Sequence, residues 1–258
     1  MSTTLLMDTD IFAYRGACIN EDKTAFGKYV WDFEDACESV DQVIAELSEN
    51  LKADRIIMCL SDEEANWRKD VLPTYKAARK ETERPEQLYM LKDYLATEYE
   101  SKGYPTLEAD DVMGILSTHP HAIEGKKIIV SEDKDMRTIP GYLYAPHRPK
   151  LKTINITELQ ADQFHMWQTL VGDPTDGYGG AFGIGKGSIF AQAVLEEDHE
   201  ELWDTVLAGY GSKGLTETEA IQQARVARIL RAEDYNIQTK ELTLWEPELL
   251  LAGKKVDT

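Results

Sequence analysis

The sequence predicts an α/β fold with a mainly parallel central sheet, followed by a helical part. Short apolar segments that indicate buried strands occur at 3–7, 55–60 and 127–131, with a possible fourth strand at 142–145. Between them, apolar residues recur at helical spacing over 35–52, 86–102 and 108–117. Apolar strands that alternate with helices are typical of a parallel sheet covered on both faces, so we expect that architecture.

The pattern changes to helices alone after about residue 150. Helices are expected at 157–171, 188–195 and 216–232. The first begins at Thr157 and Gln160, which have the spacing of a capping box, and a glycine-dense turn at 172–187 follows it. We therefore divide the chain into an α/β core, residues 1–150, and a helical subdomain, residues 151–258.

Composition excludes several classes of protein. The three cysteines, Cys18, Cys37 and Cys59, form no closely spaced pair, which argues against a disulfide framework and a zinc site. No segment approaches the roughly 18 apolar residues of a membrane span, and the first ten residues lack the pattern of a signal peptide. We expect a cytoplasmic monomer with no membrane partner.

The net charge of −19 at first argues against nucleic-acid binding, because phosphate contacts require a basic surface. Net charge is a sum over the whole chain, however, whereas binding depends on local patches. The useful question is therefore where the acids gather.

Nine carboxylates occupy positions where a ligand site is expected. Some follow the first three predicted strands, and an open α/β sheet places its ligand site beyond the carboxyl ends of its strands. Others begin a predicted helix or the glycine-dense turn. The nine are Asp8, Asp62, Glu108, Asp110, Asp111, Asp133, Asp135, Asp173 and Asp176. Because an all-oxygen site selects a hard cation, they predict two Mg²⁺ or Mn²⁺ ions that support phosphodiester cleavage.

Each of these acids also has an ordinary structural explanation. A single aspartate after a strand more often forms a turn, and this explanation is favoured for Asp10, a further acid beside Asp8. Asp110 and Asp111 would equally suit the first turn of a helix. The metal site is favoured because acids follow three separate strands and coincide with the Glu108-x-Asp110-Asp111 motif.

A basic segment at 68–84 suggests contacts with nucleic acid. Its basic residues are Arg68, Lys69, Lys76, Arg79, Lys80 and Arg84, against three acids. An aromatic residue, Tyr75, stands beside these cations, which suits stacking and phosphate contacts with a single-stranded end. A solvated helix face is the plain alternative.

The turn from Gly183 through Ile184, Gly185 and Lys186 to Gly187 is a second candidate for phosphate contacts. Glycines let the backbone approach a phosphate closely, and the following helix start offers N–H donors. An ordinary helix–helix turn would also be rich in glycine, but the paired aspartates before it favour a functional element.

Taken in order, these motifs resemble those of the flap endonuclease and 5′–3′ exonuclease family, especially its compact stand-alone bacteriophage members. The matching motifs are Asp8…Arg15, Asp62, Tyr75-Lys76-x-x-Arg79, Glu108-x-Asp110-Asp111, Ser131-x-Asp133-x-Asp135 and Gly172-Asp173-x-x-Asp176…Gly183-Ile184-Gly185. The resemblance covers residues 5 to about 195. It implies a PIN-like core, a helical arch at about 68–105 that passes single-stranded 5′ ends, and a helix–three-turn–helix element at 158–196.

The resemblance also implies roles for individual residues. The nine acids would hold the metals directly or through water, and Lys76 and Arg79 would contact the scissile phosphate. Tyr75 would stack on the terminal base. Further substrate contacts would come from Arg15, Arg68, Lys69, Gly183, Gly185 and Lys186. In relatives the glycine turn also holds a monovalent cation, usually potassium.

Three features depart from the family pattern. Thr9 follows Asp8 where glycine is frequent, and the short segment between Arg79 and Glu108 indicates a small arch. Residues 196–258 carry a net charge of −7 and have no role that the resemblance identifies.

We expect a two-metal 5′–3′ exonuclease or flap endonuclease that acts on DNA with 5′ ends, flaps or nicks, in the host cytoplasm if it is a phage protein. RNA paired with DNA, as in primer removal, is a further substrate to test. The alternatives are a PIN-type ribonuclease and a non-catalytic DNA-structure-binding protein. The glycine turn argues against the first alternative, and the complete set of motif acids argues against the second.

Overall fold

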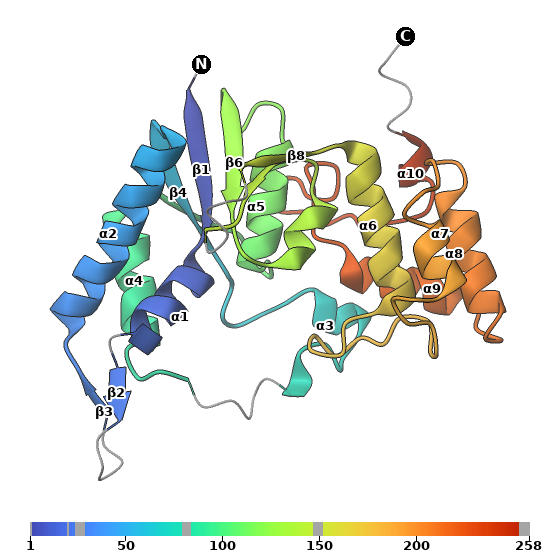
Figure 1. The fold of residues 1–258 in the computed structure, drawn as a ribbon, viewed down its shortest axis with the longest axis horizontal. Helices are drawn as coiled ribbons and strands as arrows, with labels where there is room; N and C mark the ends of the chain where they lie inside the picture. The colour runs from blue at the N-terminus through green and yellow to red at the C-terminus, as the bar shows by residue number, and fades with distance from the viewer. Residues whose placement is uncertain (1, 20, 24–28, 79–83, 147–151, 253–258) are drawn as a thin grey trace.

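The computed structural model describes residues 2–19, 21–23, 29–78, 84–146 and 152–252. Its centre is a six-stranded sheet in the order β5-β4-β1-β6-β7-β8. Figure 1 shows β4, β1 and β6 side by side. All neighbouring strands are parallel except the last pair. The strands are β1 (Thr3–Asp8), β4 (Arg55–Leu60), β5 (Ser101–Gly103), β6 (Lys126–Val130), β7 (Gly141–Tyr144) and β8 (Ile154–Ile156). A separate hairpin pairs β2 (Glu21–Lys23) with β3 (Tyr29–Trp31).

Helices cover both faces of the sheet, as the apolar strands require. In β1, Leu5 and Met7 face one hydrophobic cluster and Leu6 faces the other, because successive side chains of a strand point to opposite faces. One face is covered by α1 (Thr9–Ile19), α2 (Phe33–Leu51) and α4 (Leu88–Glu98). The other face is covered by α5 (Ala109–Thr118).

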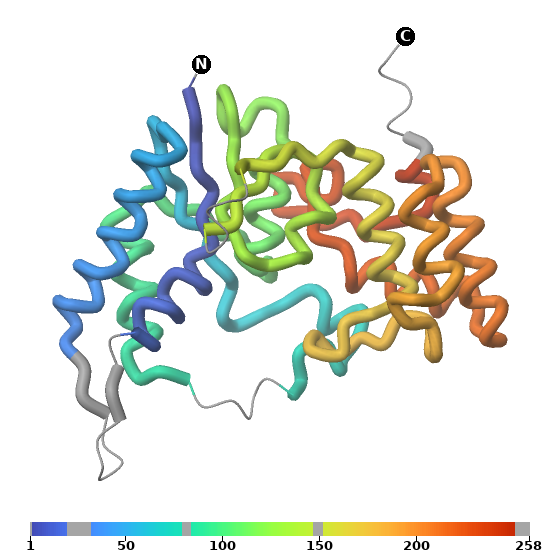
Figure 2. Tube along the Cα trace, viewed as in Figure 1, coloured from blue at the N-terminus to red at the C-terminus, as the bar shows by residue number. Residues whose placement is uncertain are grey.

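The second half of the chain is mainly helical and has a hydrophobic cluster of its own. Its helices are α6 (Glu158–Val171), α7 (Ile189–Ala193), α8 (Leu202–Gly211), α9 (Glu217–Ala227) and α10 (Leu249–Ala252). Thr157 and Gln160 form the predicted capping box at the start of α6. In the tube view, these helices form one side of the molecule, in yellow to red (Figure 2).

The segment after α9 returns to the sheet and packs against α5. The N–H of Ala232 donates to Thr118 Oγ1 at 2.9 Å, and Ile229 and Leu230 belong to the hydrophobic cluster under α5. Gly114 makes this approach possible, since a Cβ there would lie 2.3 Å from the carbonyl oxygen of Leu230. The two halves therefore share a core.

The predicted α/β class with a mainly parallel sheet is confirmed. The helix expected over 86–102 is too long, because residues 101–103 form edge strand β5 beside β4. β8 extends the sheet past the division expected at residue 150. Helices α1 and α8 were not predicted. Among the described residues, no helix is both long and apolar enough to cross a membrane.

Candidate active site

The central acids lie where β1 and β6 end and where α5 begins. Asp8 is the last residue of β1, and its Oδ1 accepts two backbone N–H groups at the start of α1, at 3.0 and 3.2 Å. Asp133 follows β6, and its Oδ1 accepts the N–H of Asp135 at 2.8 Å. Asp110 lies in the first turn of α5. Because β1 and β6 are parallel neighbours, their carboxyl ends bring these side chains to one edge.

Asp8, Asp110 and Asp133 form no ion pair with any lysine or arginine of the described residues, and we call them the unpaired acids. Burial raises the pKa of Asp8 to about 7, and the neighbouring Asp10 and Asp133 add to the rise. Burial also raises the pKa of Asp110 well above its ordinary value, with contributions from Asp8 and Asp133. This mutual repulsion favours uptake of protons or of a cation.

Glu108, Asp111 and Asp173 do have cationic partners, and we call them the paired acids. Glu108 accepts Lys76 Nζ at 2.6 Å and Arg68 at 3.0 Å. Burial alone would raise the pKa of Glu108, but the Lys76 and Arg68 cations outweigh it and lower the pKa to about 2. Burial opposes ionisation of Asp173 as well, yet its hydrogen bond from Lys134 lowers its pKa.

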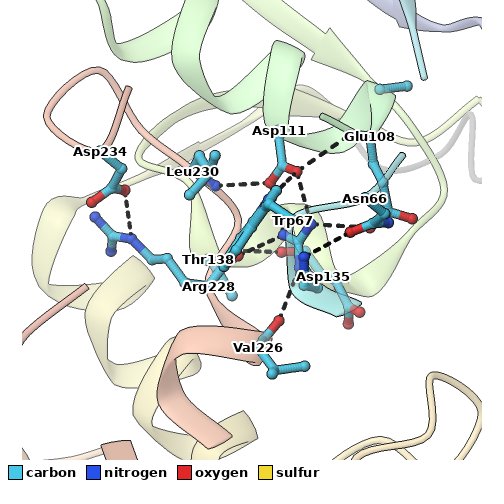
Figure 3. A network of polar contacts seen from close by, with 12 residues as sticks. Asn66, Trp67, Glu108, Asp111, Asp135, Thr138, Val226, Arg228, Leu230 and Asp234 are labelled. Carbon is cyan, nitrogen blue, oxygen red and sulfur yellow. Dashed lines mark hydrogen bonds and ion pairs between the residues drawn. The ribbon is translucent and has the colours of Figure 1, made fainter. Parts of the chain in front are cut away.

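Asp111 is fully buried, and both of its carboxylate oxygens are engaged. Two Arg68 nitrogens donate to it at 2.7 Å each, and the Trp67 indole donates at 3.1 Å. The backbone N–H of Leu230 donates to Oδ1 of Asp111 at 3.1 Å, and Figure 3 shows this hydrogen bond. A buried carboxylate with this many donors holds α5 against the segment that follows α9.

Lys76 and Tyr75 join the basic segment to the start of the glycine turn. The N–H of Lys76 donates to the carbonyl of Asp176 at 2.7 Å, and its Nζ lies 3.7 Å from Asp176 Oδ2. The Tyr75 hydroxyl donates to Glu108 at 2.9 Å. Gly177 permits the close approach of the two segments, since a Cβ there would lie 2.5 Å from the carbonyl oxygen of Thr74.

Asp135 lies between the two groups of acids. Its Oδ1 accepts the amide of buried Gln168 at 2.6 Å and lies 3.7 Å from Lys134 Nζ. Burial still raises the pKa of Asp135 to about 6, and Asp133 adds to the rise.

The donor set fits a hard divalent cation. The unpaired acids and Asp135 supply oxygen atoms alone, and the raised pKa values of Asp8, Asp110 and Asp135 mark an excess of buried negative charge. In the described residues, no three acidic, histidine or cysteine side chains converge closely enough to form a ready-made metal site. Carboxylate rotation would therefore have to accompany metal binding.

Sequence comparison places the chain in a family. Residues 3–144 match the family model "5'-3' exonuclease, N-terminal resolvase-like domain". The exonuclease of Escherichia phage T7 is 32% identical, over 94% of this chain and 93% of that protein. The chain belongs to the 5′–3′ exonuclease family.

Solved structures show the same fold in relatives of low sequence identity. The bacteriophage T5 D15 protein co-crystallised with metal ions has a TM-score of 0.60 and 17% identity, over 87% of this chain and 88% of that one. A D15 flap endonuclease in a complex with DNA and metal ions has a TM-score of 0.59 and 16% identity, with the same coverage. The PIN-like nuclease core that the motifs implied is thus confirmed.

The structure corrects the expected role of Arg68. Its guanidinium is buried and donates to Glu108, to Asp111, and to the backbone carbonyls of Val226 at 3.0 Å and Arg228 at 2.6 Å. A guanidinium has five N–H donors, and these five hydrogen bonds use them all. Arg68 therefore joins Glu108 and Asp111 to the segment at 226–228 of this nuclease and has no N–H donor left for substrate.

Two further expectations change for similar reasons. Tyr75 is buried, 4% exposed, beneath Arg68 and Lys76, so its ring face is not open to stack on a terminal base. Asp111 has no oxygen free of strong donors, so it is a supporting residue and not a metal ligand in this conformation.

Asp62 and Asp10 have local partners. Asp62 accepts the N–H groups of Thr106 at 2.7 Å and Glu64 at 2.9 Å, and these hydrogen bonds lower its pKa. Asp10 accepts Lys92 Nζ at 2.7 Å and the Ser61 hydroxyl at 2.6 Å, which links α1 to α4 and the end of β4.

The other predicted substrate residues lie on the surface or outside the described residues. Arg79 is among the residues that the structure does not describe. Lys69 is exposed on α3 (Arg68–Val71). Arg15 forms an ion pair with Glu132, with 3.8 Å between Nη2 and Oε2. Gly183, Gly185 and Lys186 are exposed in the turn before α7.

Part of the range expected for an arch, 68–105, belongs to the core. Leu88, Leu91 and Leu95 of α4 are buried against the sheet, so that helix is part of the core layer. The sequence also gave no indication of Gln168 beside Asp135. Lys134, by contrast, lies between Asp133 and Asp135 and could have been anticipated as a partner of nearby acids.

Proposed function

We propose that this nuclease hydrolyses DNA from 5′ ends, including flaps and nicks, with the help of Mg²⁺ held by Asp8, Asp110, Asp133 and Asp135. The observation that carries the proposal is the group of unpaired acids at the edge formed by β1, β6 and α5, where burial raises the pKa of Asp8 and of Asp110. Asp176 and Glu108 lie beside this group and would complete it through water.

When bound, divalent ions would supply an activated water and charge stabilisation for the leaving oxygen. The protein's own contribution begins with Lys76, whose ammonium lies between Glu108 and Asp176 at the border of the acidic group. There it would orient the scissile phosphate and offset charge that develops in the transition state. Arg79, three residues further along, is proposed to assist it.

The glycine turn is proposed to hold the duplex part of the substrate. Ser188 caps α7 through its hydroxyl, and the exposed Gly183 and Gly185 leave the backbone open to a phosphate. We further propose a potassium ion at this turn. The T5 flap endonuclease complex with DNA and metal ions, which shares the fold, supports a DNA substrate. The protein is proposed to act as a monomer in the cytoplasm.

A cleavage assay tests this function. Labelled duplex, 5′-flap and RNA–DNA hybrid substrates are incubated with Mg²⁺, Mn²⁺ or EDTA, and the products are resolved by length. We expect cleavage from the 5′ end that EDTA abolishes, and loss of cleavage in Asp133→Asn. Glu38→Gln, which removes one exposed acid on α2, is the matched control. Cleavage that persists in EDTA or in Asp133→Asn would contradict the proposal.

The same assay separates the alternative activities. Cleavage of the hybrid alone, with the RNA strand as the product, would indicate a ribonuclease. Binding of flaps without cleavage in either metal would indicate a structure-binding protein.

A further inference from the structure

Four side chains form a row along the outer face of α6. The guanidinium of Arg137 lies 4.9 Å from the ring centroid of Phe164. The Phe164 and Trp167 rings stack at 5.4 Å with an interplanar angle of 17°. At the other end, Lys186 Nζ lies 5.8 Å from the Trp167 ring. We call these four residues the cation–aromatic row.

The row connects the acidic site with the glycine turn. Arg137 belongs to the 3₁₀ helix η2 (Lys134–Thr138), which begins directly after Asp133. Lys186 belongs to the turn that leads into α7. Helix α6 lies between the end of the sheet and helices α7 and α8 (Figure 1), so its outer face spans the distance between them.

The two cations of the row are not neutralised by the protein. Arg137 and Lys186 are exposed, and neither forms an ion pair with a carboxylate of the described residues. Nearer the acids, Lys76, Lys92 and Lys134 are all engaged by carboxylates. In a chain of net charge −19, the row is therefore a local surface that offers a phosphate two cations without carboxylate partners among the described residues.

The geometry of the rings decides what the row can bind. Each ring already has the other ring and one cation of the protein as neighbours. The rings hold the guanidinium and the ammonium in place, which lowers the entropy that those side chains lose on binding. Fixed, unpaired cations suit phosphate oxygens.

We propose that the cation–aromatic row binds the phosphate backbone of duplex DNA between the cleavage site and the glycine turn. The proposal rests on the DNA nuclease function proposed above. A third cation extends the surface, since Lys213 Nζ lies 3.7 Å from the position that a Cβ on Gly183 would occupy. The row gives this acidic protein its duplex contacts without a generally basic surface.

Charge removal tests the row. Binding of a short labelled duplex in EDTA is measured by fluorescence anisotropy over a range of salt concentrations. Loss of one phosphate contact should weaken binding about eightfold at about 0.1 M salt and reduce the slope of log K against log salt by about 0.9. We expect these changes in Arg137→Gln and in Lys186→Gln. Unchanged affinity and slope in both variants would overturn the proposal.

The matched control is Lys126→Gln. Lys126 also lies over an aromatic ring, 4.1 Å from the centroid of Tyr142, but it stands at the opposite end of β6 from the acidic site. Its removal should leave duplex affinity and salt slope at the wild-type values. An equal loss in this control would mean that net charge, and not the row, determines binding, and would overturn the proposal.

The role of the rings is tested by coupling. Trp167→Leu should weaken duplex binding alone, yet add nothing in a Lys186→Gln background, because the ring acts through the lysine. Additive losses would contradict this role. A loss confined to single-stranded DNA would overturn the duplex assignment. Thermal melting of each variant checks folding, and wild-type cleavage in Mg²⁺ is scored separately. If the wild type cleaves DNA but the variants bind duplex as tightly as the wild type, the proposed role of the row is refuted and the proposed nuclease function stands.

Discussion

Two groups of acids lie side by side at the active edge of this nuclease, and they differ in what neutralises them. The paired acids, Glu108, Asp111 and Asp173, receive lysine or arginine donors. The unpaired acids, Asp8, Asp110 and Asp133, receive none from the described residues, and the pKa of Asp8 rises to about 7 while that of Glu108 falls to about 2. Both groups are carboxylates of the same set of motifs, and Asp110 and Asp111 are even adjacent in the chain, so the three-dimensional surroundings separate them.

This difference distinguishes acids that hold the fold together from acids that are available to a ligand. A buried carboxylate with a guanidinium partner is costly to disrupt, because removal of either partner leaves an uncompensated charge. Buried carboxylates that repel one another reduce stability until a cation binds. Neutralising one member of each group should therefore have opposite effects on stability.

The largest effect is expected for Asp110→Asn. Cleavage should fall on the order of a thousandfold, because a charge proposed to hold the metal is lost. Stability without metal should rise, since the substitution relieves repulsion from Asp8 and Asp133. Single-turnover cleavage in Mg²⁺ and thermal melting in EDTA measure the two effects. A lower melting temperature would show that Asp110 is structural and would remove the distinction between the groups.

Asp111→Asn should have the opposite effect on stability. It weakens the contact with buried Arg68, and breaking a buried pair costs about 3–5 kcal/mol. Urea unfolding should therefore show a much lower midpoint, with lost activity as a consequence of unfolding. Activity that is lost at an unchanged midpoint would instead assign Asp111 to the metal site.

Gln168→Leu probes Asp135, which lies between the groups. Gln168 is the same size as leucine to a first approximation, and its amide donates to Asp135 Oδ1 at 2.6 Å. Loss of such an orienting hydrogen bond typically weakens metal binding about 10- to 100-fold. The Mg²⁺ concentration for half-maximal cleavage should rise by about tenfold while saturating Mg²⁺ restores most of the rate. No change in Mg²⁺ dependence would remove Gln168 from the site.

The last expected effect is a dependence of stability on pH. The pKa of Asp8 is raised from 3.8 to about 7 and that of Asp135 from 3.8 to about 6. Between pH 3.8 and about 7, the folded protein therefore binds more protons than the unfolded chain. The free energy of unfolding should therefore decrease as pH rises from about 4 to 7. The lowered pKa of Glu108 changes the free energy of unfolding only below about pH 4.5, the ordinary pKa of this group.

Thermal melting in EDTA across this range measures the decrease. Mg²⁺ binds the ionised carboxylates, so the rise in melting temperature that it causes should be larger at pH 8 than at pH 5. A melting temperature in EDTA that increases between pH 5 and 7 would contradict the raised pKa values of Asp8 and Asp135.

The sequence was sufficient to predict the four central strands of the sheet and the positions of the acids. Apolar runs such as Arg55–Leu60 locate buried strands, and parallel strands necessarily bring their carboxyl ends together. The three residues of β5 could not be predicted, because they carry no pattern of their own and form a strand only by pairing with β4.

The division into paired and unpaired acids was also beyond prediction. It depends on contacts between residues far apart in the chain, such as Arg68 with the carbonyl of Val226 and Asp111 with the N–H of Leu230. The basic residues at 68–84 were counted as a surface for DNA because local composition does not reveal which cations are buried. Arg68 and Tyr75 were misassigned for this reason.

The contacts that Arg68 and Asp111 make with residues 226–230 have a consequence for the order of events during synthesis. Every acid of the active edge precedes Val226 in the chain and is therefore synthesised first, yet the hydrogen bonds that fix α5 need the backbone at Val226, Arg228 and Leu230. A nascent chain that stops before this point lacks the support of its catalytic helix. A chain truncated before residue 226 is therefore expected to cleave DNA poorly, although it contains every acid of the active edge.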